Sequence, residues 1–107
     1  MNKEQWVQLQ IRLNSYLLDF RLNYSFYRNG KNKKIRDEAE GKMNLAKNYV
    51  CKLIEETYEV YELLTGGDNV SDYGRVIIYD EFKQLRYFED ELQKFINEIS
   101  KKIENFN

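Results

Sequence analysis

Residues 4–27 read EQWVQLQIRLNSYLLDFRLNYSFY, and the spacing of the apolar side chains in this stretch determines the fold class. One set of apolar residues steps along it by three or four positions, which is the period of an α-helix and not that of a strand. Its members are Trp6, Leu9, Leu13, Tyr16, Phe20, Tyr24 and Tyr27. We therefore predict a helix over residues 3–28.

Two more segments repeat this period. The second carries Ile35, Ala39, Met43, Ala46, Val50, Leu53, Thr57, Val60 and Leu64. The third carries Ile78, Phe82, Leu85, Phe88, Leu92, Phe95, Ile99, Ile103 and Phe106. We place helices at 34–65 and 72–105, and the short connectors make each helix run back along the previous one. The prediction is one all-α domain over residues 1–107, an elongated antiparallel three-helix bundle with coiled-coil-like crossings of about 20°.

Glycines mark the ends of the predicted helices, and the chain has no proline. Asn29-Gly30 predicts a left-handed cap at the end of the first helix, and Gly66-Gly67 ends the second. Gly41 lies inside the second helix, where glycine costs about 1 kcal/mol relative to alanine. A close approach of another helix would explain that glycine.

The absence of histidine from the sequence excludes many kinds of active site. Histidine is the most common general base and transition-metal ligand. Histidine-containing catalytic triads, zincin metal sites and Glu-x-x-His di-iron bundles are therefore ruled out. A phosphate-binding glycine loop and a nucleophile elbow are missing as well. We predict no catalytic residue, no metal ligand and no cofactor.

One short run of carboxylates permits an alternative. Glu55, Glu56 and Glu59 stand in the order Glu-Glu-x-x-Glu, which resembles the element that opens the Mg²⁺ site of all-α NTP pyrophosphatases. That family has a second element, Glu-x-x-Asp, on the following helix. Here Glu81 is followed three places later by glutamine and Glu89 by leucine. The resemblance implies a diverged Mg²⁺-dependent nucleotide pyrophosphohydrolase, whereas an uninterrupted helix would point these carboxylates at solvent.

The expected location is the cytoplasm, with no membrane partner. Cys51 is the single cysteine, so it forms no internal disulfide and gives no sign of an oxidising compartment. The chain starts Met1-Asn2-Lys3-Glu4 without an apolar signal segment after it. Neither secretion nor membrane insertion is predicted.

A cluster of cations lies around the first connector. It consists of Arg28, Lys31, Lys33, Lys34 and Arg36. An anionic, phosphate-rich partner such as a nucleic acid fits this basic cluster, but the net charge of −1 argues against a general nucleic-acid binder. The simpler interpretation, which we prefer, is a solvated connector in which Arg28 interacts with the C-terminal end of the first helix.

The first helix carries a second apolar stripe. Its members, about 180° from the first stripe, are Val7, Ile11, Leu18, Leu22 and Phe26. A three-helix bundle has one interior, so both stripes do not fit the same core. Three explanations follow: the helix pairs with its own copy, it binds a foreign protein, or the other helices bend around it and cover both sides. We predict the first, a homodimer through this stripe.

These observations predict a non-enzymatic protein-protein interaction module. Abundant lysine, asparagine, isoleucine and tyrosine are typical of an AT-rich genome. Small helical proteins from AT-rich bacteria and their phages often act as inhibitors, immunity factors or regulators, and this is the role we expect. The pyrophosphohydrolase remains the alternative, and the identity of the partner does not follow from the sequence.

Overall fold

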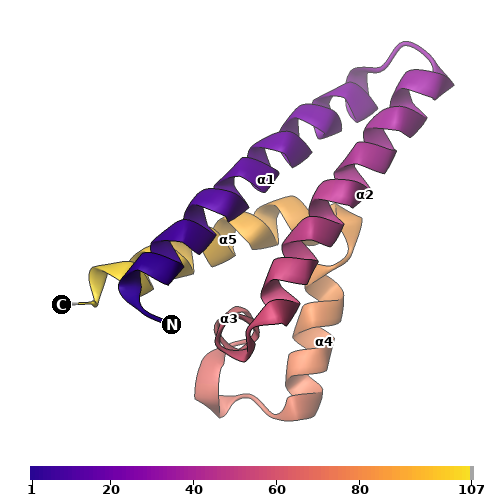
Figure 1. Ribbon diagram of the computed structural model, residues 1–107. Helices are drawn as coiled ribbons and strands as arrows, with labels where there is room; N and C mark the ends of the chain where they lie inside the picture. Colours follow the sequence, from indigo (N-terminus) through magenta and orange to yellow (C-terminus); the bar gives the residue numbers. More distant parts are fainter. Residues whose placement is uncertain (107) are drawn as a thin grey trace.

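The computed structural model describes residues 1–106 and is all-helical (Figure 1). Helices cover 87% of the described residues, and no strand occurs among them. The predicted fold class is therefore confirmed. Within residues 1–106, no helix combines the length and the apolar character that crossing a membrane requires.

The first two helices form a long antiparallel hairpin. Helix α1 (Lys3–Asn29) begins with a capping box. The Asn2 side-chain oxygen accepts from the Gln5 backbone N–H, and the Gln5 side-chain oxygen accepts from the Asn2 backbone N–H. Helix α2 (Lys33–Glu56) is capped by Asn32, whose side chain accepts from the Ile35 amide at 2.9 Å. Figure 1 shows the two helices side by side over most of their lengths. The predicted boundaries of the first helix are right to within a residue.

The count of three helices is wrong, because both later segments are broken. The chain continues as α3 (Tyr58–Leu64), a 3-10 turn η1 (Gly67–Asn69), α4 (Asp72–Phe82) and α5 (Leu85–Glu104). Thr57 has an extended backbone, φ −137° and ψ 121°, and separates α2 from α3. Gln84, with φ −71° and ψ 128°, separates α4 from α5. Within residues 1–106, five α-helices replace the predicted bundle of three.

Packing gives a physical reason for the two breaks. An unbroken helix over 34–65 would be about 48 Å long, whereas α1 is about 40 Å long, so its last turns would have no partner. The break at Thr57 turns α3 inward and buries Val60. The break at Gln84 lets Phe82 and Phe88 both enter the core, with ring centroids 5.3 Å apart. Burial of these side chains offsets the lost helical hydrogen bonds.

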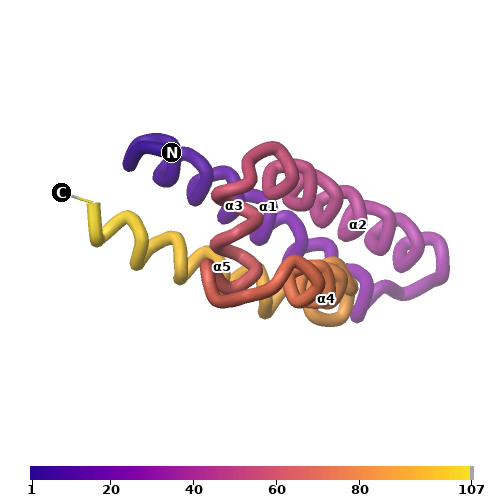
Figure 2. Tube along the Cα trace, turned by 90° about the horizontal axis from the view of Figure 1, so that it is seen from below, coloured from indigo at the N-terminus to yellow at the C-terminus, as the bar shows by residue number. Residues whose placement is uncertain are grey.

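The long helices enclose the core along one side of the hairpin. Figure 2 shows α5 lying along one side of the α1–α2 layer, and Figure 1 shows α3 and α4 at the lower end of α2. Trp6, Leu13, Met43 and Leu92 are among the fully buried side chains. The extents are 50 × 30 × 19 Å, and the radius of gyration of 15.0 Å exceeds the roughly 13 Å expected of a compact chain of this length. The predicted elongated shape is confirmed.

Two glycine predictions are wrong. Gly30 has φ −61°, so it is not a left-handed cap; a Cβ there would lie 2.7 Å from the Phe26 carbonyl oxygen, and lack of space explains the glycine. A Cβ at Gly41 would meet nothing within 4 Å, so no close helix crossing accounts for that residue. Gly66 and Gly67 do adopt positive φ, 104° and 78°, and end α3 as predicted.

Candidate interaction face on helix α1

The second apolar stripe of α1 is exposed. The exposed fractions are 57% for Ile11, 64% for Leu18, 56% for Leu22 and 51% for Phe26, and Val7 is half-buried. Among the described residues, no helix lies over this side of α1 (Figures 1 and 2). The explanation that the other helices cover both sides is therefore wrong for the single chain.

The neighbouring helices hold α1 by its inner face and its two edges. On the edge toward α2, the rings of Tyr16 and Tyr49 stack with centroids 5.6 Å apart. On the edge toward α5, Arg21 Nε donates to Glu89 Oε1 at 2.9 Å. These contacts fix the rotation of α1 about its axis, so the apolar stripe opposite the core stays in solvent.

Between Val7 and Phe26 the stripe belongs to a face without charge, which we call the outer face; Glu4, one turn before Val7, lies on the same side of the helix. The outer face comprises Val7, Gln8, Ile11, Asn14, Ser15, Leu18, Leu22, Ser25 and Phe26. The exposed side of a helix in a monomeric protein normally carries lysine and glutamate. Protein interfaces are instead depleted of charge at their centres. The composition of the outer face is that of an interface centre.

Apolar surface continues from the outer face onto α2. Phe26 and Ile35, both exposed, line one shallow hollow between the two helices. Leu45 and Tyr49, also exposed, line a second hollow of about 260 Å³ beside Tyr16. The apolar surface thus reaches α2 at Phe26 and Ile35, whereas Asp19, Asn23 and Lys42, which also line the second hollow, separate Leu45 and Tyr49 from the outer face.

The basic cluster lies at the tip of the hairpin, where α1 joins α2. All five of its side chains are exposed. Arg36 Nη1 donates to the Gly30 carbonyl oxygen at 3.0 Å, and the Arg28 guanidinium lies over the Tyr24 ring, 5.7 Å from its centroid. Arg28 is in the last turn of α1, where a cation interacts favourably with the helix C-terminus. These contacts tie two of the five cations to the hairpin itself.

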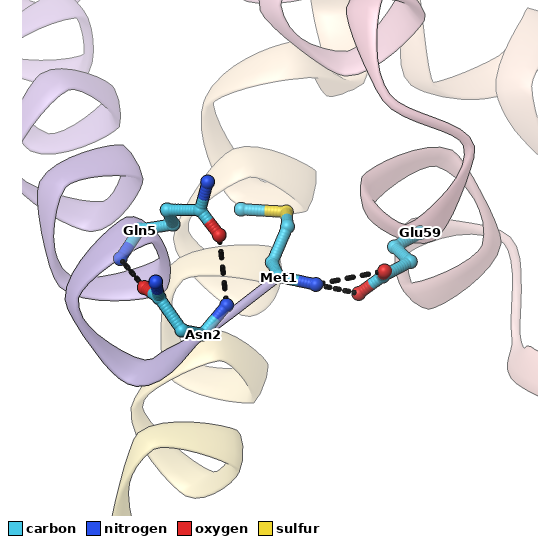
Figure 3. A network of polar contacts seen from close by, with 4 residues as sticks. All are labelled: Met1, Asn2, Gln5 and Glu59. Atoms are coloured by element: carbon cyan, nitrogen blue, oxygen red, sulfur yellow. Dashed lines mark hydrogen bonds and ion pairs between the residues drawn. The ribbon is translucent and has the colours of Figure 1, made fainter.

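The structure separates the three carboxylates of the Glu-Glu-x-x-Glu run. Glu55 and Glu56 end α2, whereas Glu59 lies in α3 beyond the break. The Glu55 carboxylate accepts from the Tyr79 hydroxyl at 2.7 Å. Both oxygens of Glu59 accept from the Met1 amine at 2.8 Å (Figure 3). No group of three metal-ligating side chains occurs in residues 1–106.

Two buried polar groups were not predicted from the sequence. Arg75, 5% exposed, donates to Thr65 Oγ1 at 2.9 Å, to the Glu62 carbonyl oxygen at 3.3 Å and to the Gly67 carbonyl oxygen. It holds the turn between α3 and α4 together. Its position four residues after the Ser71 cap gives no sequence signal for burial, because a lone arginine is usually exposed.

The second buried polar group is Tyr79. Its hydroxyl donates to Glu55 and lies 3.3 Å from the Cys51 carbonyl oxygen. Burial, together with the hydrogen bond to Glu55, raises the pKa of Tyr79 above its usual value. Burial also raises the pKa of the Cys51 thiol, which disfavours the reactive thiolate. The surroundings of Tyr79 and Cys51 are therefore those of a packed core and not of a nucleophilic site.

Comparisons of the chain with protein-family models, with curated proteins and with solved structures find no match.

Proposed function

We propose that this chain is a non-enzymatic interaction protein that binds another protein through the outer face of α1. The observation that carries the proposal is the exposure of Ile11, Leu18, Leu22 and Phe26 on a face without charge, opposite the core. Burying a large apolar side chain fully is worth about 1.5–3 kcal/mol, so a partner that covers four half-exposed ones gains several kcal/mol.

The rigidity of α1 also supports this proposal. The inner face is buried along most of its length, from Trp6 to Phe20, so the helix is folded before any partner arrives. A preformed surface avoids the entropic cost that a disordered segment meets on binding. The role we propose is that of a small cytoplasmic inhibitor, immunity or regulatory protein.

We do not extend the proposal to nucleotide hydrolysis. Glu55 and Glu59 are engaged by the Tyr79 hydroxyl and the Met1 amine, and no contact brings them together around a substrate-sized site. The basic cluster likewise supports no separate nucleic-acid proposal, because two of its cations contact the hairpin itself.

A photo-crosslinking experiment tests the proposal. A benzophenone amino acid replaces Leu18 on the outer face or, as a matched control, the exposed Lys94 on α5, and the protein is irradiated in cells that naturally produce it. We expect discrete protein adducts from position 18, identified by mass spectrometry, and none of the same adducts from position 94. If position 18 gives no adduct beyond those of the control, the proposed function is wrong.

A further inference from the structure

We infer that the occupant of the outer face is a second copy of this chain, with the two α1 helices antiparallel about a twofold axis. The axis passes midway between the helices at the level of Tyr16 and Leu17. This inference rests on the proposed function and names the partner of the same face.

The apolar pattern of the outer face is nearly symmetric about this point. In an antiparallel pair, residues equally far from the axis on opposite sides face each other. Ile11 then faces Leu22 of the second copy, and Val7 faces Phe26. Each contact occurs twice, as an isologous interface requires. Near the centre, the small Ser15 faces Leu18 of the second copy, the most exposed residue of the stripe. A small side chain thus lies opposite a large one, and the two can interdigitate.

The flanking charges are complementary in the same arrangement. Arg12 and Asp19 lie on one edge of the outer face, about 20° apart around the helix. Both are exposed, and neither has an ion-pair partner among residues 1–106. The twofold axis brings this edge against the same edge of the second copy. Arg12 of one copy then lies within about 3 Å, along the helix axis, of Asp19 of the other. Two reciprocal ion pairs result.

A parallel pair lacks both features. Parallel helices place each residue beside its own copy, so Ser15 would meet Ser15 and leave a void next to two leucines. They also bring opposite edges together, so Asp19 would lie level, within about 3 Å along the helix axis, with Arg21, which already forms an ion pair with Glu89 at 2.9 Å. The antiparallel arrangement is therefore favoured by packing and by charge.

The other exposed apolar face of the molecule has no such pattern. Tyr73, Val76 and Ile77 project from one side of α4 and are exposed, but Asp80 lies on the same side. A twofold pairing of α4 would bury this carboxylate or place it beside its own copy. Lys83 pairs with Asp80 from the flank only, at 3.4 Å. The outer face of α1 is the self-complementary one.

The size of the contact sets the expected affinity. Residues 7–26 of α1 extend over about 30 Å, which gives a narrow strip at the lower end of stable interfaces, about 1,200 Å² in total. A dimer at tens of micromolar that dissociates on dilution is the expected behaviour.

Charge reversal tests the register. We propose to measure the dimer dissociation constant by sedimentation equilibrium for wild type, Arg12→Asp, Asp19→Arg and the double variant. Each single change places like charges opposite each other twice and should weaken the dimer about tenfold. The double variant restores opposite charges and should return close to the wild-type value. Because both side chains are exposed and unpaired within the chain, helix content should not change, and circular dichroism checks this.

Other outcomes overturn the inference in distinguishable ways. A dimer that ignores both charge reversals would refute the antiparallel register. A chain that stays monomeric at tens of micromolar, while position 18 crosslinks to a foreign protein, would refute self-association and leave the proposed function standing. A monomer without adducts at position 18 would refute both.

Discussion

Leu17 and Leu18 are the same residue in adjacent positions of α1, yet Leu17 is 1% exposed and Leu18 is 64% exposed. Leu17 belongs to the core cluster that also contains Trp6 and Phe20, whereas Leu18 lies at the centre of the outer face. Hydrophobic periodicity identifies the apolar faces of a helix, but the packing of the other helices decides which face becomes the core. An apolar helix face that the fold leaves exposed, like the outer face, indicates a contact with another chain.

The largest expected effect separates these two leucines. Leu17→Ala should lower the free energy of unfolding by about 2–5 kcal/mol, because it leaves a cavity in the core. Leu18→Ala should change it by less than about 0.5 kcal/mol, since that side chain is 64% exposed. Chemical denaturation at a concentration where the chain is monomeric measures both. Equal losses would show that the assignment of inner and outer faces is wrong.

The contrast between buried and exposed groups extends to arginine. Arg75→Lys should cost about 1–3 kcal/mol, because lysine cannot reproduce the fork that reaches Thr65 and two carbonyl oxygens, and buried acceptors lose their donors. The same change at the exposed Arg12 should be neutral in the monomer to within about 0.5 kcal/mol. Thermal denaturation compares them. A neutral Arg75→Lys would mean that the turn between α3 and α4 does not depend on this network.

On α2, one substitution is expected to raise the free energy of unfolding by a smaller amount. Gly41→Ala should stabilise the fold by about 0.5–1 kcal/mol, because alanine restores helix propensity and its Cβ meets nothing within 4 Å. Gly30→Ala should destabilise it, since the added Cβ would contact the Phe26 carbonyl oxygen at 2.7 Å. If Gly41→Ala destabilised the chain, that side of α2 would have a contact that the single chain does not show.

The last of these effects concerns the pH dependence of stability, which should differ between a buried and an exposed tyrosine. The raised pKa of Tyr79 means that the folded state keeps a proton which the unfolded state releases above its usual value of 10.0. Stability should therefore fall as pH rises above 10.0, and the fall should be shallower in Tyr79→Phe. Tyr73→Phe, at an exposed position, is the control and should leave the slope unchanged. Identical slopes for all three proteins would contradict the burial of the Tyr79 hydroxyl.

The sequence predicts the helical class well and the breaks poorly. Apolar residues recur every three or four positions in all three predicted segments. Most of those predicted within α2 and α5 are buried in the structure. Thr57 and Gln84 end their helices with neither glycine nor proline nearby. Tertiary packing of Val60, Phe82 and Phe88 makes these breaks favourable, and such long-range gains leave no local signal.

The outer face was predictable for a related reason. Its residues repeat every three or four positions about 180° from the first stripe, so the second stripe is visible in the sequence. Whether it is covered by the chain itself was not predictable, because that depends on where α2 and α5 pack. The Arg75 network depends on how α4 packs against the turn after α3, and the burial of Tyr79 on how α4 packs against the end of α2, so neither was predicted.

The central claim is that the outer face of α1, and not exposed apolar surface in general, mediates association. Light scattering at tens of micromolar on three proteins tests it most directly: wild type, Leu18→Glu with Leu22→Glu, and Val76→Glu with Ile77→Glu on α4 as the matched control. We predict twice the chain mass of 13.0 kDa for wild type and control, and a folded monomer for the α1 variant. A monomeric wild type, or an α1 variant that remains dimeric, would contradict the account.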